Sequence, residues 1–189
     1  MMNGNYEAVV VGTSAGGLNA LAAILGKLPQ QYKIPIIIVQ HRSKDSLELF
    51  EEVLQQKCRI RIKQADEKEK ISAGVIHVAP PDYHLLVEMD KTFSLSSDPP
   101  VQFSRPSIDV LFESAASAYR RNLVGIILTG SNNDGASGMA TISNFGGLTI
   151  AQDPREAQYS FMPQAAVDTG KVTHVWRLAE IADFLKSIG

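Results

Sequence analysis

The feature that most constrains the fold is a set of short apolar runs, each followed by a helical pattern. Residues 7–11, 36–39 and 123–128 carry such runs, apolar apart from Glu7 at the start of the first, and they do not alternate with polar residues. Runs of this kind are typical of strands buried on both faces. Leucines at helical spacing follow the first run as far as Leu28, and Pro29 ends them. Strand–helix alternation predicts an α/β fold with a parallel sheet and right-handed crossovers.

The remaining segments extend this pattern. Asp45 and Glu48 stand where an N-cap and its reciprocal partner begin a second helix, and Ser107 stands at the cap of a third. Residues 59–63 alternate and predict an edge strand, whereas 66–70 predict a solvated loop. Two strands at 75–79 and 85–88 flank a proline turn, which suggests a hairpin. Further strands are predicted at 92–95, 148–151 and 172–175, and helices at 136–144, at 164–169 and at the end of the chain.

Composition excludes several classes of protein. The 189 residues suit one domain, and a net charge of −2 gives no reason to expect nucleic-acid binding. Cys58 is the only cysteine, so no internal disulfide forms and no Cys/His zinc pattern is present. The N-terminus lacks the order of a signal peptide, and no apolar run is long enough to span a membrane. We therefore expect a cytoplasmic protein that is not inserted in a membrane.

A glycine-rich turn follows the first run. Ser14 stands at the centre of a G-x-S-x-G pattern, between a predicted strand and a predicted helix. Such a turn exposes a nucleophilic hydroxyl above the sheet, beside the free N–H groups of a helix N-terminus. The same pattern also suits a phosphate-binding loop. However, Ser14 occupies the second glycine position of the dinucleotide motif, and no phosphate-loop lysine follows.

Two more reactive residues follow strand ends. His41 comes after the second run, and Asp134 comes in the loop after residues 123–128. Because ligands bind at the carboxyl ends of parallel strands, these residues and Ser14 are expected at one edge. His41 would then accept the Ser14 proton, and Asp134 would orient the imidazole. Alone, His41 is more typical of a cap or the core, and Asp134 of a turn; together the three favour a catalytic triad.

Other reactive side chains carry weaker signals. A structural role is the better interpretation for His77 within a strand, and packing for Cys58. His84 either lines the site or faces solvent, and His174 lies on a short strand near the end of the chain. Arginines near the predicted loops, which would suit an acidic substrate, are Arg42, Arg105 and Arg155.

A series of motifs, in a fixed order along the chain, resembles the catalytic domain of the CheB family of chemotaxis receptor methylesterases. The motifs are Gly12-Thr13-Ser14-Ala15-Gly16-Gly17, Val39-Gln40-His41-Arg42, Val78-Ala79-Pro80-Pro81-Asp82-Tyr83-His84-Leu85, Arg105-Pro106-Ser107-Ile108-Asp109-Val110-Leu111-Phe112, Leu128-Thr129-Gly130, Asn133-Asp134-Gly135-Ala136, and Gly146-Gly147 with Ile150-Ala151-Gln152-Asp153. The resemblance runs from about Tyr6 to the last helix.

The resemblance implies a doubly wound α/β domain, with helices on both faces of a mainly parallel sheet and a small antiparallel hairpin. It implies a serine hydrolase of γ-glutamyl methyl esters on the cytoplasmic helices of methyl-accepting chemoreceptors, with deamidation of receptor glutamines in some members. The family's nucleophile, base and acid fall on Ser14, His41 and Asp134. Backbone N–H groups of Ala15 and of the loop at Ser131 and Asn132 would hold the oxyanion, with Arg42 near the substrate. No metal or organic cofactor is needed.

The chain departs from the family pattern at two places. Ala15 stands where better-known members have threonine, and Ser131-Asn132 where they have Met-Gly. No receiver domain precedes the first strand, so residues 1–189 are expected to form a single catalytic domain. Two other hypotheses remain open: a non-catalytic module that docks on receptor or signalling helices, and a nucleotide-binding domain that uses the glycine loop.

Overall fold

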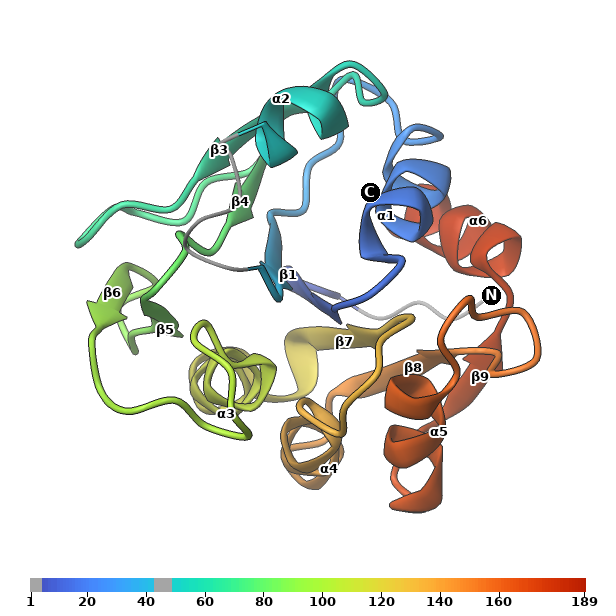
Figure 1. The fold of residues 1–189 in the computed structure, drawn as a ribbon. Helices are drawn as coiled ribbons and strands as arrows, with labels where there is room; N and C mark the ends of the chain where they lie inside the picture. The colour runs from blue at the N-terminus through green and yellow to red at the C-terminus, as the bar shows by residue number, and fades with distance from the viewer. Residues whose placement is uncertain (1–4, 43–48) are drawn as a thin grey trace.

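A parallel sheet forms the centre of the molecule. The computed structural model describes residues 5–42 and 49–189. The strands of the sheet are β1 (Ala8–Thr13), β2 (Ile36–Gln40), β3 (Arg61–Gln64), β4 (Val75–Val78), β7 (Leu123–Ile127), β8 (Leu148–Gln152) and β9 (His174–Trp176). Their order is β3-β4-β2-β1-β7-β8-β9, and every neighbouring pair is parallel. Figure 1 shows β1 and β7 at the middle of the fold, and β3 is at an edge as predicted.

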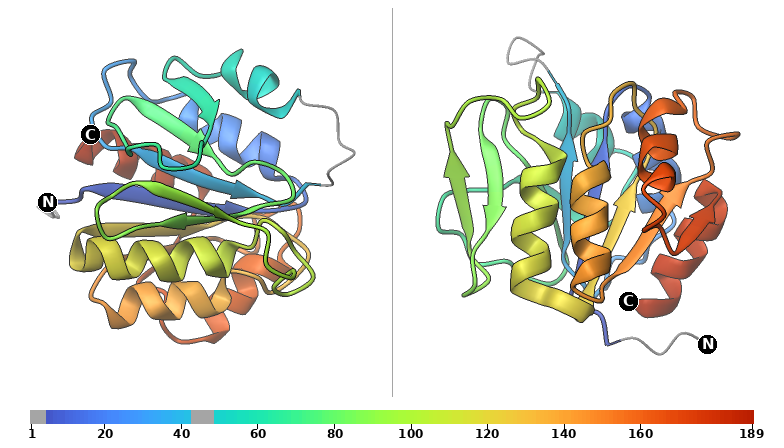
Figure 2. Two further views of the ribbon diagram at one scale, coloured as in Figure 1. Left: turned by 90° about the vertical axis from the view of Figure 1, so that its left-hand side faces the viewer. Right: turned by 90° about the horizontal axis from the view of Figure 1, so that it is seen from below.

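Helices cover both faces of the sheet (Figures 1 and 2). One face carries α1 (Gly17–Leu25), α2 (Phe50–Gln55) and α6 (Leu178–Ile188). The other carries α3 (Ile108–Tyr119), α4 (Ala136–Asn144) and α5 (Phe161–Asp168), and a short 3₁₀ helix (Arg120–Asn122) follows α3. The doubly wound α/β architecture is therefore confirmed.

Alternation along the central strand divides the core in two. Val9 and Val11 belong to the apolar cluster on the side of α1, whereas Ala8 and Val10 belong to the cluster on the side of α3. Successive side chains of a strand point to opposite faces, so each half of the core receives every second residue. This explains why β1 reads as an unbroken apolar run.

The small antiparallel sheet differs from the predicted hairpin. β5 (His84–Val87) pairs antiparallel with β6 (Phe93–Ser96), not with the preceding strand. The 75–79 segment instead forms β4, which pairs parallel with β2 and β3 inside the main sheet. The predicted pairing across the proline turn is therefore wrong, although a small hairpin does exist. Val78 and its neighbours are already paired on both sides, so β5 finds its partner in the next segment.

Two other predictions need comment. α1 ends at Leu25, earlier than Pro29, because the chain continues in i→i+3 turns in which Lys27 N–H donates to Ile24 O and Leu28 N–H to Leu25 O. The turns keep Leu28 buried, which explains its helical spacing. The predicted cap at Asp45 and Glu48 lies outside the described residues. Among the residues the structure describes, no helix has the length and apolar character to cross a membrane.

Candidate functional site

The ends of three neighbouring strands bring the predicted site residues to one edge. Thr13 of β1 is in register with Gln40 of β2, and Gly12 with Ile127 of β7. Ser14 and His41 are therefore each the first residue beyond a paired strand end. Ser14 N–H donates to Thr129 O at 3.0 Å, and His41 N–H donates to Thr13 O at 3.0 Å. These bonds hold the Ser14 backbone to the loop after β7 and the His41 backbone to β1.

Two glycines of the turn are required by packing and by backbone conformation. A Cβ on Gly12 would lie 2.3 Å from Cγ2 of Ile108, the first residue of α3. Gly16, the N-cap of α1, has φ +79°, in the left-handed region that favours glycine. Gly12 therefore lets α3 start close to Ser14, and Gly16 turns the chain into α1.

Gln40 ties the two strand ends together, and sequence reasoning missed this role. Its Nε2 donates to both Ser14 O and His41 O, each at 2.9 Å. The side chain is almost completely buried. The only sequence signal for this role was the position of Gln40 immediately before His41, because a glutamine at a strand end does not itself indicate any chemistry.

His41 and Asp134 form a direct pair. His41 Nε2 lies 2.7 Å from Asp134 Oδ2, with the imidazole 11% exposed and the carboxylate fully buried. A short contact between a buried carboxylate and an imidazole fixes the ring orientation and stabilises the imidazolium. The structure therefore brings together two of the three predicted triad members in the geometry that the prediction requires.

The Asp134 carboxylate is held by the N-terminus of α3. Ile108 N–H donates to Oδ2 at 2.7 Å, and Asp109 N–H donates to Oδ1 at 3.0 Å. The Ser107 hydroxyl donates to Oδ1 at 2.8 Å, and Ser107 is also the N-cap of α3, as predicted. A helix N-terminus presents free N–H groups and a partial positive charge to an anion.

These contacts determine the charge of Asp134. Burial raises the pKa of this carboxyl, but the hydrogen bonds from His41 and from the backbone N–H groups of Asp109 and Ile108 outweigh burial and lower its pKa below 3.8. Asp134 is therefore a carboxylate at neutral pH. It follows that the shared proton belongs to His41 Nε2 and that Nδ1 is the free basic nitrogen. This reverses the ring assignment of the chymotrypsin triad.

Asp109 is a second buried carboxyl next to Asp134. It accepts from Gly135 N–H at 3.0 Å and Gly138 N–H at 2.7 Å, at the start of α4. Burial raises the pKa of Asp109 to about 6 and the neighbouring Asp134 charge adds to this, against hydrogen bonds that lower it. Sequence reasoning did not find this residue, because its partners lie more than twenty positions away.

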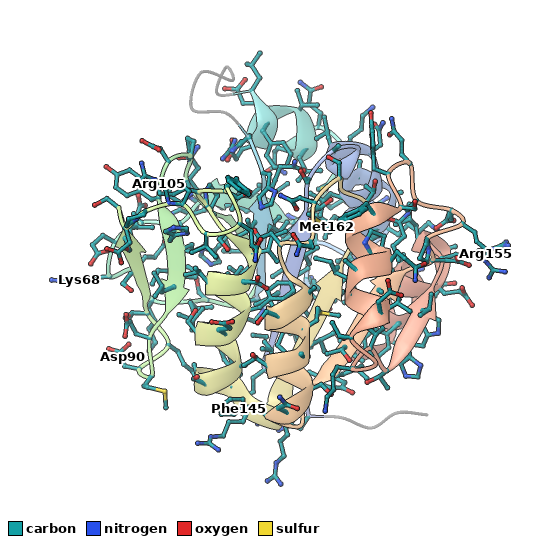
Figure 3. All side chains as sticks on the ribbon, turned by 60° about the horizontal axis from the view of Figure 1, so that its bottom comes forward. Lys68, Asp90, Arg105, Phe145, Arg155 and Met162 are labelled. Carbon is teal, nitrogen blue, oxygen red and sulfur yellow. The ribbon has the colours of Figure 1, made fainter. Side chains whose placement is uncertain are left out.

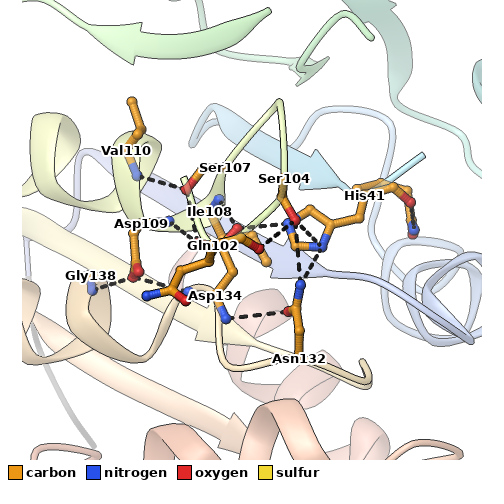
Figure 4. A network of polar contacts seen from close by, with 12 residues as sticks. His41, Gln102, Ser104, Ser107, Ile108, Asp109, Val110, Asn132, Asp134 and Gly138 are labelled. Carbon is orange, nitrogen blue, oxygen red and sulfur yellow. Dashed lines mark hydrogen bonds and ion pairs between the residues drawn. The ribbon is translucent and has the colours of Figure 1, made fainter. Parts of the chain in front are cut away.

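The free nitrogen of His41 faces two polar side chains (Figure 4). Ser104 Oγ lies 3.4 Å and Asn132 Nδ2 lies 3.5 Å from His41 Nδ1. Asn132 Oδ1 accepts from Asp134 N–H at 3.3 Å, which turns the amide nitrogen toward the ring. Among the described residues, no hydrogen bond joins the Ser14 hydroxyl to His41. Ser104 carried no sequence signal, because its role depends on a loop that folds back over the sheet edge.

His84 lies beneath the site. It is 2% exposed, so neither predicted position, lining the site or facing solvent, fits it. Its Nδ1 accepts from Ser107 N–H at 3.1 Å, and its Nε2 lies 3.1 Å from Pro99 O. The imidazole therefore supports the residue that holds Asp134.

The other predicted residues lie as follows. Arg42 pairs with Glu51 (3.0 Å) and Arg105 with Asp82 (2.7 Å), while the Arg155 side chain is 88% exposed and pairs with Asp153. Ser131 is exposed.

The structural interpretations of His77 and Cys58 are confirmed, since both side chains are buried and the aromatic ring of Phe93 packs on His77. Burial raises the pKa of the Cys58 thiol to about 11. Within residues 5–42 and 49–189, no cluster of three or more His, Cys, Asp or Glu suits a metal ion.

Comparisons with known proteins agree with this geometry. A family model described as CheB methylesterase matches residues 9–185. The Thermotoga maritima CheB methylesterase catalytic domain superposes with a TM-score of 0.92 at 28% identity, over 97% of this chain and 99% of that one. A Leptospira interrogans protein with the provisional name protein-glutamate methylesterase/protein-glutamine glutaminase is 51% identical over 95% of this chain and 93% of its own.

A Clostridium acetobutylicum protein named protein-glutamate methylesterase/protein-glutamine glutaminase is 36% identical over 95% of this chain. The match spans 52% of that longer relative. The resemblance predicted from the sequence motifs is confirmed.

Proposed function

The chain belongs to the CheB methylesterase family, and we propose that it hydrolyses γ-methyl esters of glutamyl residues with Ser14 as nucleophile. The observation that supports this most directly is the 2.7 Å contact between His41, just after β2, and Asp134, in the loop after β7. Residues 1–189 act as one catalytic domain in this proposal. Related proteins are also named as glutaminases, so glutamine side chains are a second substrate.

The acylation step follows from the charges at the site. Ser14 Oγ attacks the ester carbonyl carbon while His41 Nδ1 takes its proton, and Asp134 stabilises the imidazolium. For this, the hydroxyl moves into hydrogen-bond reach of Nδ1 in the presence of substrate, as catalytic contacts tighten in the Michaelis complex. The tetrahedral intermediate then expels methanol, which takes the proton from His41.

Deacylation uses the same groups in reverse. Water attacks the acyl-enzyme carbonyl and gives a proton to His41, and Ser14 leaves with that proton to restore the hydroxyl. The products are a glutamyl carboxylate and methanol, or ammonia in place of methanol for a glutamine. His41 carries each proton that moves between Ser14, the attacking water and the leaving group, and the carboxylic acid product ionises by releasing its own proton to solvent. The reaction therefore balances with the side chains described and needs no cofactor.

Two N–H groups suit the oxyanion. The backbone N–H of Ala15 follows the nucleophile, just before the N-cap of α1, and makes no hydrogen bond within the described part of the chain. Asn132 Nδ2 lies 3.5 Å from His41 Nδ1 and also donates to Ser104 Oγ at 3.4 Å, so this amide stands beside the proposed base. Preorganised donors of this kind stabilise developing charge without reorganisation. Asn132 in place of glycine therefore supplies a side-chain donor that the better-known family pattern lacks.

Because the chain belongs to the CheB methylesterase family, the proposed substrate is a methylated polypeptide of a chemoreceptor. Methanol release from a methylated receptor fragment tests the activity directly, with the Ser14→Ala protein as control. We expect release by the wild type and none by the variant. Equal release by both proteins would show that Ser14 is not the nucleophile.

A fluorophosphonate probe separates the enzyme from a docking module. Selective labelling of Ser14 is expected, and His41→Ala removes it because the hydroxyl loses its base. Binding to receptor fragments without labelling or methanol release would favour the non-catalytic alternative.

A further inference from the structure

Phe103 is the most exposed large apolar side chain of the described chain, with a relative accessibility of 101%. It lies on a turn closed by two hydrogen bonds between Val101 and Ser104, of 3.1 and 2.9 Å. Both central residues of the turn have positive φ, +48° for Gln102 and +62° for Phe103. Such conformations cost free energy in residues other than glycine and cluster at functional sites. The turn therefore exposes an aromatic ring to water at a cost in free energy. A role of the ring in binding would explain why this conformation is kept.

The turn is anchored next to the proposed base. The Arg105 guanidinium donates to Asp82 Oδ1 at 2.7 Å and to Ser97 O at 2.7 Å. On the other side, Ser104 Oγ lies 3.4 Å from His41 Nδ1. Phe103 is thus fixed close to the reaction centre.

Two pockets meet at this point, and each has an apolar wall. One, of about 410 Å³, is lined by His41, Ser104 and Phe103. The other, also of about 410 Å³, is lined by Ser14 and by Leu49 and Val53, which are 50% and 36% exposed. Arg42 lines both pockets, so the two adjoin. Exposed apolar side chains therefore stand on both sides of the proposed nucleophile and base; we call Phe103, Leu49 and Val53 the apolar rim.

We infer that the apolar rim binds an amphipathic helix of the polypeptide substrate and that Phe103 is its principal contact. The inference rests on the proposed function. A glutamyl ester side chain is short, so the polypeptide backbone that carries it lies close to the rim when the carbonyl reaches Ser14. On a helix, residues three and four positions away lie on the same face as the ester, so apolar side chains at those positions face the surface around Ser14 and pack on the rim. A free amino-acid ester has no such neighbouring side chains.

Binding without turnover tests the inference. A labelled helical peptide with one central glutamyl γ-methyl ester is titrated with Ser14→Ala protein and with the Ser14→Ala/Phe103→Ala double variant. We expect the dissociation constant to rise roughly 10- to 100-fold, the value of burying one phenylalanine side chain. Phe103→Leu should retain most of the affinity. Met89→Ala, which truncates an exposed side chain next to Asp90 at the other end of the hairpin from Arg105 (Figure 3), should change nothing.

Steady-state kinetics of proteins that retain Ser14 separate this inference from the proposed hydrolase function. Phe103→Ala should lower kcat/KM for the peptide through KM and spare hydrolysis of free γ-methyl glutamate. A parallel loss with both substrates would assign Phe103 a structural role and overturn the inference, as would unchanged peptide affinity. Peptide binding that depends on Phe103, without hydrolysis of either ester by the wild type, would overturn the proposed function and leave the docking surface standing.

Discussion

Asp134 and Asp109 each cap the helix on which the other depends. Asp134, just before α4, accepts from the first N–H groups of α3, and Asp109, in the first turn of α3, accepts from Gly135 and Gly138 at the start of α4. The two helices and the proposed catalytic acid therefore form one unit. Changes at either carboxyl affect both stability and chemistry.

Asp134→Ala should lower the free energy of unfolding by about 2–4 kcal/mol, because it leaves the N–H groups of Ile108 and Asp109 without a partner. Asp134→Asn keeps an acceptor oxygen and should cost less. Both variants should lose about 10⁴-fold in kcat, as expected when the imidazole loses its carboxylate. Urea unfolding and methanol release on the same preparations measure the two effects, and full stability in the alanine variant would contradict the capping role.

Asp109→Asn should remove a pH dependence of stability. The pKa of Asp109 is about 6 in the folded protein, above the ordinary aspartate value of 3.8. Its contribution to stability is therefore fully present below pH 4 and is lost as pH rises through 6, by at most about 3 kcal/mol. Urea unfolding between pH 4 and 7 should show the wild type losing stability relative to the variant. Asp183→Asn, the same substitution at an exposed position on α6, serves as control and should leave the pH dependence of the wild type in place.

His84→Phe should lower kcat, because Ser107 N–H loses its acceptor and the support beneath Asp134 loosens. The buried, unpartnered N–H should also reduce stability by about 1–3 kcal/mol. His84→Asn places an amide oxygen near the position of Nδ1 and should recover most of kcat. Equal kinetics for the phenylalanine and asparagine variants would refute a positioning role.

Asn132→Ala should reduce kcat about 10²- to 10³-fold with little change in KM, the usual effect of losing one oxyanion donor. Asn132→Asp has nearly the same shape but no donor, and it adds a negative charge close to Asp134. It should therefore be at least as slow. Steady-state hydrolysis of the methylated peptide gives both constants, and an unchanged kcat in the alanine variant would assign the oxyanion to backbone groups alone.

Local patterns predicted the strands and the strand-end residues well. β1 and β2 carry apolar runs that only a buried parallel sheet accommodates, so Ser14 and His41 fall at adjacent ends without any knowledge of the loops. α4 begins and ends where its residue pattern predicts, at Ala136 and Asn144. These features depend on residues close together in the sequence.

Features set by distant contacts were not predictable. The strand His84–Val87 pairs forward with β6 because β4 is already paired on both sides in the main sheet. The burial of His84 and the capping by Asp109 depend on α3 packing against residues more than twenty positions away. No local periodicity records such contacts. The contact of Ser104 with His41 likewise depends on the path of a loop over the sheet edge.

The link between Asp134 and α3 has a consequence for interpreting related sequences. An aspartate at this position is needed to start a helix whether or not an ester is ever cleaved. A relative that had abandoned hydrolysis would keep it for folding, and its presence would say nothing about turnover. Ser14 lies in a half-buried turn, and its hydroxyl makes no hydrogen bond within the described part of the chain. This position therefore distinguishes working enzymes from relatives that only bind.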